Sequence, residues 1–437
     1  MPPGAVVVLT AAASAGPVDA LLRAGIDGDR MLWDGRADGG PSLAGVGATA
    51  VTEADGEGAL ATVRAAGIAL LNGLVLRTDD GVDAPSPALL GGSAFHPGAP
   101  RDAVWAGFAD ASFVLPRWVY GRQGDRGFLR LALRAGELAD GDRVLAEVRR
   151  VQAALATASP AGVAPRMDAQ VEELARPRWD ALVDGALTAI RGGAVEKLVV
   201  ARRCRIVASR PFDPVAAVLQ AGAVDLDVAC FAVERSGRSF VAATPERLVV
   251  LRGGTASVDA LAGSAARGAV GAPAALMTSD KDRREHAMVV DAVRDALAPF
   301  CAGEPHVPAQ PVVRTLRHLH HLWTPVRAAV GVGTHVLDLA AALHPTPAVA
   351  GRPRRASMAW IAANEPVGRG WYAGPVGWFD AAGDGALVVA LRSAVVAGRE
   401  AWIYAGAGVV LGSTAAGEWA ETATKQRAMR SALGVEA

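Results

Sequence analysis

The sequence predicts a mixed α/β protein. In the N-terminal third, short apolar runs are separated by Gly, Pro and Asp, a pattern typical of antiparallel strands. These runs are Ala5–Leu9, Gly67–Leu76, Phe113–Leu115 and Phe128–Leu133. Further along the chain, several segments instead repeat their apolar residues at helical spacing. With 437 residues, the chain can bury one large core or two ordinary ones.

Composition excludes several classes of partner. Lys plus Arg equals Asp plus Glu at 44 each, so no charge excess indicates binding to nucleic acid or to an anionic membrane. Cys204, Cys230 and Cys301 lack CxxC spacing and lie in apolar surroundings, as expected for reduced cysteines. The N-terminus lacks a basic region before its apolar run, and no uninterrupted apolar span reaches the roughly 18 residues that a membrane helix requires. The sequence therefore predicts a cytoplasmic protein.

The first part of the chain carries few chemical signals. Asp142–Leu155 has helical periodicity, and the Ala-, Ser- and Pro-rich Ala156–Ala164 is either a linker or a surface loop within one domain. Gly45–Gly47 and Gly91-Gly92 are interpreted as tight strand ends. Neither has the GxGxxG spacing of a nucleotide-binding turn.

A lysine begins the first strand of the second part. Trp179, Val183, Ala186 and Ile190 recur at helical spacing up to Gly192, and a buried strand then starts at Lys197. Most lysines in this position extend their ammonium group to solvent. If the ammonium is partly desolvated, it loses its proton more readily and can serve as a general base.

A glutamate follows two predicted strands, Leu226–Val233 and Ser239–Ala243. Pro245 fixes a turn, and Glu246 begins the next strand, where pairing with Arg247 or water is the structural alternative to a chemical role. Leu261–Ser264 is expected to be a small-residue turn whose backbone N–H groups could meet an oxyanion.

An acidic residue lies on the apolar face of a predicted helix, Asp280–Pro299. Glu285 is in line with an apolar stripe of Met288, Val289, Ala292 and Ala296, and a buried carboxylate must be paired, protonated or metal-bound. Asp282 precedes it by one turn. His286 is off this line, and the cluster His318, His320 and His321 lacks the spacing of a zinc helix, so zinc is not expected.

A second acidic helix follows the glycine-rich strand that starts at Tyr404, with Ser413 or Thr414 as N-cap. Glu418, Glu421 and Lys425 share one face of it. They suit a metal ion beside a small anion, or else a capping acid pair with an exposed Glu–Lys pair. The presence of two acidic helices favours metal ligation.

Three further segments complete the pattern. Leu343–Gly351, with two prolines, is predicted to be a rigid loop that lines a pocket, and Tyr372–Trp378 a short strand. Ala386–Val396 is predicted to be one long apolar strand interrupted only by Arg392. A guanidinium there needs a carboxylate, either from the protein or from a ligand.

Taken in order, these segments resemble the chorismate-utilising enzymes, and among them the isochorismate synthases. The resemblance is dense from Trp179 to Gly434 and thinner through Trp105–Arg117. Each segment is weak evidence alone, but nine in this order are specific. They are Lys197 in KLVVAR, Glu246 in TPERL, Leu261–Ser264 (LAGS), KDRREHAMVVD around Glu285, HPTPAVAG from His344, YAGPVGW from Tyr372, Arg392 in ALRSA, AGAG at 405–408, and GEWAETATK ending at Lys425.

The resemblance implies a single domain, residues 1–437, with two large, mainly antiparallel sheets packed as a sandwich and helices outside. Residues 1–155 would form a divergent part contributing strands, and residues 175–435 the catalytic core. Family members are often monomers, so a monomer is expected, without a glutaminase subunit. The expected ligands are chorismate and Mg2+.

The resemblance also implies roles for individual residues. Glu285 and Glu421 would hold Mg2+, with Glu418 and Asp282 acting through waters. Lys197 would deprotonate a water that attacks ring C2, and Glu246 would protonate the departing C4 hydroxyl. The substrate-binding residues implied are Gly263, Ser264, His344, Thr346, Ala348, Tyr372, Arg392, Gly406, Gly408 and Lys425.

Other members of the family remain as alternatives. Anthranilate and aminodeoxychorismate synthases carry a Gly-Ala/Ser-Pro-Lys element where this chain has His344–Ala348. Salicylate synthases share the base and the acid, so pyruvate elimination after isochorismate formation is the second candidate function. They differ from this chain in carrying Thr near Ala348. A non-catalytic binding protein is a third, although binding alone would not require both proton-transfer groups. Menaquinone, siderophore and salicylate synthesis all remain open as destinations of the product.

Overall fold

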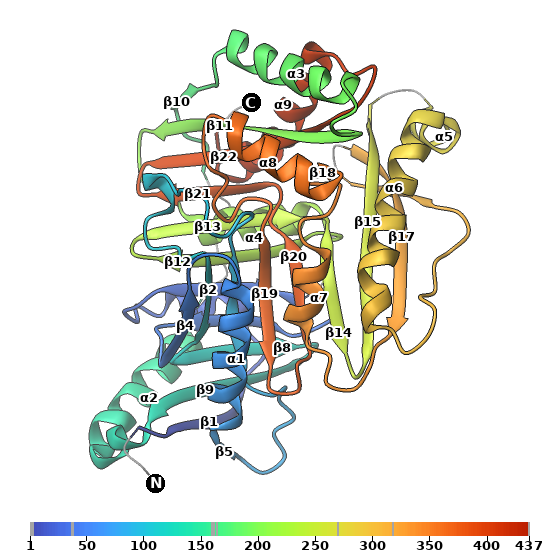
Figure 1. The fold of residues 1–437 in the computed structure, drawn as a ribbon. Coiled ribbons are helices and arrows are strands. Elements are labelled where there is room, and N and C mark those ends of the chain that lie inside the picture. Colours follow the sequence, from blue (N-terminus) through green and yellow to red (C-terminus); the bar gives the residue numbers. More distant parts are fainter. Residues whose placement is uncertain are drawn as a thin grey trace.

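The computed structural model describes residues 4–35, 39–158, 162, 165–268, 271–316 and 319–435. These residues form two large, mainly antiparallel sheets with helices on the outside, which confirms the predicted fold class (Figure 1). The ladders between described strands are antiparallel apart from the parallel pair β1–β5.

The larger sheet has thirteen strands and takes them from both ends of the chain. Their order is β10 (Ala169–Glu172), β11 (Lys197–Ala208), β22 (Glu400–Val409), β21 (Ser393–Ala397), β13 (Arg238–Thr244), β12 (Ala229–Arg235), β2 (Arg30–Asp34), β3 (Ser42–Val46), β8 (Trp118–Gln123), β9 (Arg126–Arg134), β1 (Val6–Ala13) and β5 (Val75–Thr78), with β18 (Gly351–Arg352) paired to β11.

The smaller sheet has nine strands and likewise mixes early and late segments. Their order is β16 (Val312–Thr315), β17 (Leu319–Ala329), β15 (Thr255–Ala266), β14 (Arg247–Arg252), β20 (Gly385–Val389), β19 (Pro375–Asp380), β6 (Ala88–Ser93), β7 (Ala111–Leu115) and β4 (Ala50–Ala54).

Helices cover the outer faces of both sheets. In Figure 1, α6 lies along β15 and β17, and α3 and α9 lie against β11 and β22. The helices are α1 (Ala59–Asn72), α2 (Gly141–Thr157), α3 (Arg176–Arg191), α4 (Pro214–Val224), α5 (Ala272–Thr278), α6 (Asp280–Leu297), α7 (Val336–Leu343), α8 (Arg354–Asn364) and α9 (Ala415–Ala432). Among the described helices, none has both the length and the apolar character needed to span a bilayer.

Aromatic residues fill the space between the sheets. Trp105, from the N-terminal part, packs edge-on against Phe240 with ring centroids 5.0 Å apart, and its Nε1 donates to the Tyr404 hydroxyl at 3.1 Å. Tyr404 in turn stacks on Tyr372. The N-terminal part therefore supplies core that supports the strand preceding α9.

A buried arginine attaches α9 to the larger sheet. Arg202, 1% exposed on β11, lies over the Trp419 ring at 3.8 Å and donates to Thr422 Oγ1 at 2.8 Å. Arg202 also forms an ion pair with Glu173. These contacts set the position of the helix that carries the second acidic pair.

Most predicted elements of the first part are confirmed, but the predicted strand Gly67–Leu76 is wrong. Most of it belongs to α1, whose buried residues Ala59, Val63, Gly67 and Leu71 repeat every four positions. Gly67 is a helix-packing glycine rather than a break, because a Cβ there would lie 2.6 Å from the Phe379 ring. Gly91 and Gly92 likewise lie inside β6 and are not strand ends. The predicted linker Ala156–Ala164 lies partly outside the described residues.

We predict that Gly67→Ala lowers the free energy of unfolding by about 1–3 kcal/mol, because the added methyl clashes with the Phe379 ring. Gly185→Ala in α3 is the matched control: its Cβ would be 3.5 Å from Trp360, an ordinary contact, so helix propensity should stabilise it by about 0.5–1 kcal/mol. Chemical denaturation measures both. Equal stabilisation by the two substitutions would contradict the packing argument.

Candidate active site

Lys197 begins β11 and is almost completely buried. Its side chain is 2% exposed, and Nζ donates to Glu285 Oε1 at 2.8 Å. The neighbouring strand β22 leaves room for it, since a Cβ on Gly408 would lie 3.0 Å from Lys197 Cε. The AGAG sequence thus has a local physical reason: a side chain at Gly408 would displace the lysine.

Glu246 lies between β13 and β14 and is 4% exposed. Burial raises the pKa of Glu246 to about 8, and the negative charge of Asp259 adds to this shift. The positive charges of Arg392, Lys197 and Lys425 act in the opposite direction and do not overcome it. Glu246 is therefore a neutral carboxylic acid at pH 7, the form that can donate a proton.

The suggested pairing of Glu246 with Arg247 is wrong. Arg247 instead makes two hydrogen bonds of 2.8 Å to the Asp259 carboxylate. In the part of the chain that the structure describes, no cation forms an ion pair with Glu246. Adjacency in sequence did not indicate this, because Arg247 faces the neighbouring strand β15.

The predicted single strand Ala386–Val396 is also wrong. The chain leaves β20 in the smaller sheet, crosses between the sheets, and enters β21 in the larger one. Arg392 lies at the crossing with φ of 49°, a left-handed conformation that is uncommon for a non-glycine residue. Its guanidinium makes no hydrogen bond or ion pair with any described residue, so it can accept an anionic ligand.

Leu261–Ser264 is part of β15 rather than the predicted turn. The register with β17 shifts between Ala262 and Ser264, and Gly263 has φ of 79°, so the segment is a β-bulge. Ser264 Oγ lies 2.8 Å from His321 Nδ1. The small residues serve the bulge, which the sequence alone did not distinguish from a turn.

His321 is a pocket residue that the sequence reasoning missed. Burial, together with the positive charges of Arg392 and Lys425, holds the pKa of His321 well below its ordinary value, so the ring is neutral. Its Nε2 atom is buried without a partner in the described structure. The histidine cluster was considered only as a possible zinc site. The observation that indicates another role is the position of His321 opposite Ser264 in the β15–β17 ladder. His318 lies outside the described residues.

Helix α6 is rotated by about one residue from its predicted orientation. Its buried residues are His286, Val289, Val293 and Leu297 rather than the stripe expected with Glu285. His286 can be buried because Thr324 Oγ1 lies 2.7 Å from its Nε2 and the Ala262 carbonyl 3.3 Å from its Nδ1.

Glu285 lies at the edge of this face with its side chain 16% exposed. Burial raises its pKa, but the charge and hydrogen bond of Lys197 outweigh burial, so the pKa of Glu285 is below its ordinary value. Glu285 is therefore an ionised carboxylate.

Helix α9 begins at the predicted N-cap Thr414, whose hydroxyl accepts from Gly417 N at 3.1 Å. Lys425 Nζ donates to Glu421 Oε1 at 2.6 Å and to the Gly406 carbonyl at 2.9 Å. Burial and the nearby charge of Glu421 raise the pKa of Glu418. Each pocket lysine thus neutralises one carboxylate, while Glu418 is left with a like charge beside it.

The described residues contain no group of three Asp, Glu, His or Cys side chains close enough to form a complete metal site. The chemistry of the acidic donors nevertheless fits Mg2+, since all of them are carboxylate oxygens. The raised pKa of Glu418 beside Glu421 indicates that an added cation would be favourable there.

Most of the predicted residues line one pocket of about 520 Å3, the catalytic pocket. An adjoining space of about 390 Å3, the tyrosine cavity, is lined by Tyr372 and Gly406. Asp282, Glu418, His344 and Thr346 line neither. The predicted residues in the catalytic pocket are Lys197, Glu246, Gly263, Ser264, Glu285, Ala348, Arg392, Gly408, Glu421 and Lys425.

His344 and Thr346 hold the pocket loop instead of facing its interior. His344 Nε2 lies 3.1 Å from the Phe95 carbonyl, and burial lowers the pKa of His344 to about 3. The Thr346 carbonyl accepts from Val349 N and Ala350 N, which closes the turn behind Ala348. The loop thereby presents Ala348 to the pocket.

A compositional signal could have identified the lysines sooner. Lys197, Lys281 and Lys425 are the only lysines in the sequence, although it has 44 basic residues of the Lys and Arg types. Two of these three line the catalytic pocket. Arginine keeps its proton and presents a larger planar group, so lysine is retained where a compact or deprotonatable amine is needed.

Comparison with known proteins identifies the family of the chain. A family model described as chorismate binding enzyme matches residues 5–434. The chain belongs to this family. The resemblance stated from the nine segments is therefore confirmed.

Among curated relatives, a salicylate biosynthesis isochorismate synthase of Pseudomonas aeruginosa is 37% identical over 83% of this chain and 78% of its own length. The isochorismate synthase MenF of Bacillus subtilis is 32% identical over 81% of this chain and 76% of its own. A solved structure of the menaquinone-specific MenF of Escherichia coli covers 98% of this chain and 94% of its own, with TM-score 0.80 and 24% identity, which supports the shared fold.

We predict that Glu246→Gln removes a pH dependence of stability. Below pH 4.5 both the folded and the unfolded chain hold the Glu246 proton; between 4.5 and about 8 only the folded chain does. Across that window the parent protein should lose stability relative to the variant by about 1.4 kcal/mol per pH unit.

The measurement is the free energy of unfolding of both proteins at several pH values across the window. Glu196→Gln, at an exposed carboxylate beside Lys197, is the control and should show no such slope. A constant difference between parent and Glu246→Gln would show that Glu246 has an ordinary pKa.

Proposed function

We propose that this protein converts chorismate to isochorismate, by adding water at ring C2 and releasing the C4 hydroxyl. The observation that carries the proposal is a buried, neutral carboxylic acid in the same pocket as a buried lysine. The names of the two curated relatives support the same reaction.

Glu246 is the proposed general acid. Hydroxide is a poor leaving group, so the C4 hydroxyl must gain a proton as it departs, and a carboxyl can supply it at neutral pH only if its pKa is raised. The pKa of about 8 for Glu246 meets this requirement. Proton transfer by such a group typically contributes about 10²–10⁴-fold in rate.

Lys197 is the proposed general base. Its present partner is Glu285, to which Nζ donates a hydrogen bond of 2.8 Å. As a general base Lys197 acts through its neutral amine, so its ammonium proton must pass to solvent before it can accept a proton from the attacking water. The base gains one proton and Glu246 gives one up, so exchange with solvent restores both groups after each turnover.

Two cations are positioned for the carboxylates of the substrate. Among the residues that the structure describes, none pairs with Arg392, and Lys425 lines the same pocket, so we assign both cations to the enolpyruvyl carboxylate. The backbone of the Gly263 bulge and of Gly408 borders the same space. Guanidinium suits this role because it stays charged when buried and matches a carboxylate with two parallel hydrogen bonds.

We assign Glu285 and Glu421 to Mg2+, with Glu418 and Asp282 acting through water. The bound ion would neutralise these carboxylates and hold the ring carboxylate of the substrate. Glu285 and Glu421 line the catalytic pocket, whereas Glu418 and Asp282 lie behind it, which agrees with a division into direct and water-mediated donors.

Salicylate formation, in which pyruvate is eliminated from isochorismate, is the second candidate. Its support is the name of the Pseudomonas aeruginosa relative, a salicylate biosynthesis isochorismate synthase. Amination by an anthranilate-type reaction has no comparable support. We further propose that the protein is a cytoplasmic monomer that works without a glutaminase subunit. Use of its product in menaquinone synthesis or in siderophore synthesis fits equally.

We predict that Lys197→Ala and Glu246→Gln each lower turnover of chorismate by at least about 100-fold, since each removes one proton-transfer group. Products are separated by chromatography, which distinguishes isochorismate, salicylate plus pyruvate, and an aminated ring. Glu196→Gln is the matched control and should retain full activity. Near-normal turnover by either pocket variant, with the fold intact, would refute its assigned role.

We also predict that the ligand-free protein binds Mg2+ in calorimetry, and that Glu285→Gln or Glu421→Gln weakens binding by at least about tenfold, because each loses a charged oxygen donor. This readout does not depend on activity. Unchanged Mg2+ affinity in both variants would place the metal elsewhere.

A further inference from the structure

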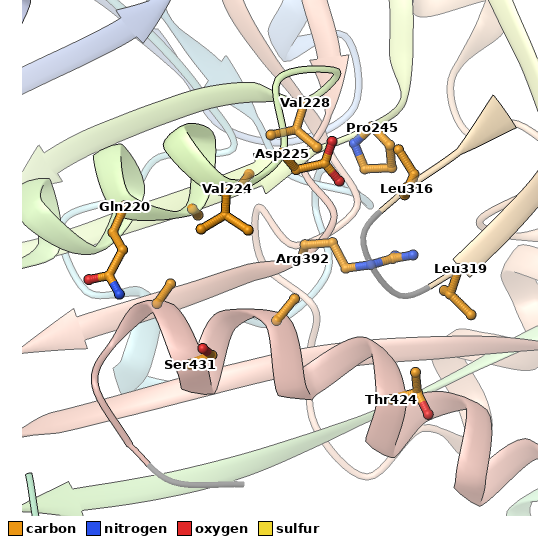
Figure 2. Close-up of a pocket in the computed structure, with 14 residues that line it drawn as sticks. Gln220, Val224, Asp225, Val228, Pro245, Leu316, Leu319, Arg392, Thr424 and Ser431 are labelled. Carbon is orange, nitrogen blue, oxygen red and sulfur yellow. The ribbon is translucent and has the colours of Figure 1, made fainter. Parts of the chain in front are cut away.

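A third cavity shares Arg392 with the catalytic pocket and the tyrosine cavity. This outer cavity, of about 670 Å3, lies between α4 and α9 (Figure 2). Much of its wall is apolar, with Ala221 and Val224 from α4, Val228 beyond that helix, and Ala428 from α9. Apolar walls with a few polar groups among them are typical of small-molecule sites.

Helix α9 serves both spaces with different faces. Glu421 and Lys425 line the catalytic pocket, whereas Thr424 and Ala428 line the outer cavity. The two spaces share Pro245 and Arg392 in their linings, so an occupant of one can affect the other.

Arg392 lines the outer cavity, the catalytic pocket and the tyrosine cavity. Figure 2 shows its side chain extending between α9, which carries Thr424, and the segment that carries Asp225. Among the residues that the structure describes, none pairs with its guanidinium. Arg392 is half-buried, and a partly desolvated charge without a partner is costly, so an anion reaching it from the outer cavity would be favoured.

Asp225 limits what that anion can be. It is the acidic residue among those lining the outer cavity, and its negative charge acts on Arg392. Among the described residues that line the outer cavity, one guanidinium and one carboxylate leave little net positive charge, so a dianion such as phosphate is disfavoured. A single carboxylate, carried by an apolar group that fits the aliphatic walls, matches the site best.

We propose that the outer cavity binds small aromatic monocarboxylates, with the carboxylate paired to Arg392 and the ring between α4 and α9. Binding there uses the same guanidinium that the proposed function gives to the substrate, so the ligand inhibits by raising the apparent KM for chorismate. This inhibitory consequence rests on the proposed function, whereas the binding itself does not.

The test uses benzoate as probe, with calorimetry on the ligand-free protein and inhibition kinetics on the same preparation. Benzoate should bind with a Kd of about 1 mM, and acetate, which lacks the ring, and benzamide, which lacks the charge, should each bind at least about tenfold more weakly. No detectable benzoate binding, or equal binding of all three, would overturn the proposal.

Substitutions on α4 separate the outer cavity from the catalytic pocket. Ala221→Phe and Val224→Trp fill the cavity and should weaken benzoate binding by about tenfold or more, with kcat and KM for chorismate unchanged without benzoate. Val224 is 46% exposed, so its variant should fold even if Ala221→Phe does not. Ala223→Phe, on the exposed face of the same helix, is the matched control and should bind benzoate normally.

Asp225→Asn is a further test variant. Removing its negative charge should strengthen benzoate binding several-fold. Benzoate binding that persists unchanged in Ala221→Phe and Val224→Trp would place the probe in the catalytic pocket and refute the outer site. If the protein does not turn over chorismate, the proposed function fails, but calorimetry still decides the binding proposal.

Discussion

The arrangement of charge around Glu246 is the constraint on which the site depends. The two lysines of the catalytic pocket are each committed to another carboxylate, Lys197 to Glu285 and Lys425 to Glu421. Glu246 is consequently buried without an ion-pair partner among the described residues. Burying a neutral acid costs far less than burying an isolated carboxylate, so the protein keeps Glu246 protonated.

The fold creates this distribution of charge because residues from both sheets meet in the catalytic pocket. Lys197 comes from an end of β11 in the larger sheet, while Glu246 lies where the chain passes from β13 in the larger sheet to β14 in the smaller one. Arg392 lies at another crossing, between β20 in the smaller sheet and β21 in the larger one. Gly408 allows Lys197 to extend past β22 toward Glu285, because a side chain at this position would occupy the space of the lysine. The missing side chain of Gly408 is therefore needed for the ion pair between Lys197 and Glu285.

Much of this arrangement could be predicted from sequence. Cap residues and helical spacing located α3 and α9, including the N-cap Thr414, and nine ordered segments indicated the family. The residues expected to act together mostly do line one pocket. These predictions succeed for a common reason. They depend on local periodicity, or on residue types for which few purely structural roles are available at that position.

The failures have a different physical origin. Gly67 was interpreted as a strand residue, but it lies in a helix. A glycine is needed there because the helix packs against Phe379, a tertiary contact that the sequence does not reveal. The Ala386–Val396 run looked continuous because both strands are apolar, although the chain changes sheets between them. The partner of Arg247 is Asp259 on the neighbouring strand, so proximity in sequence indicated the wrong acid. Each error concerns tertiary contacts between distant segments.

The most direct test of the account is a titration of the Glu246 carboxyl itself, by infrared difference spectroscopy of the parent protein against Glu246→Gln. The account predicts a protonated-acid band that persists through neutral pH and disappears with a pKa of about 8. A carboxylate band already present at the ordinary glutamate pKa of 4.5 would contradict it.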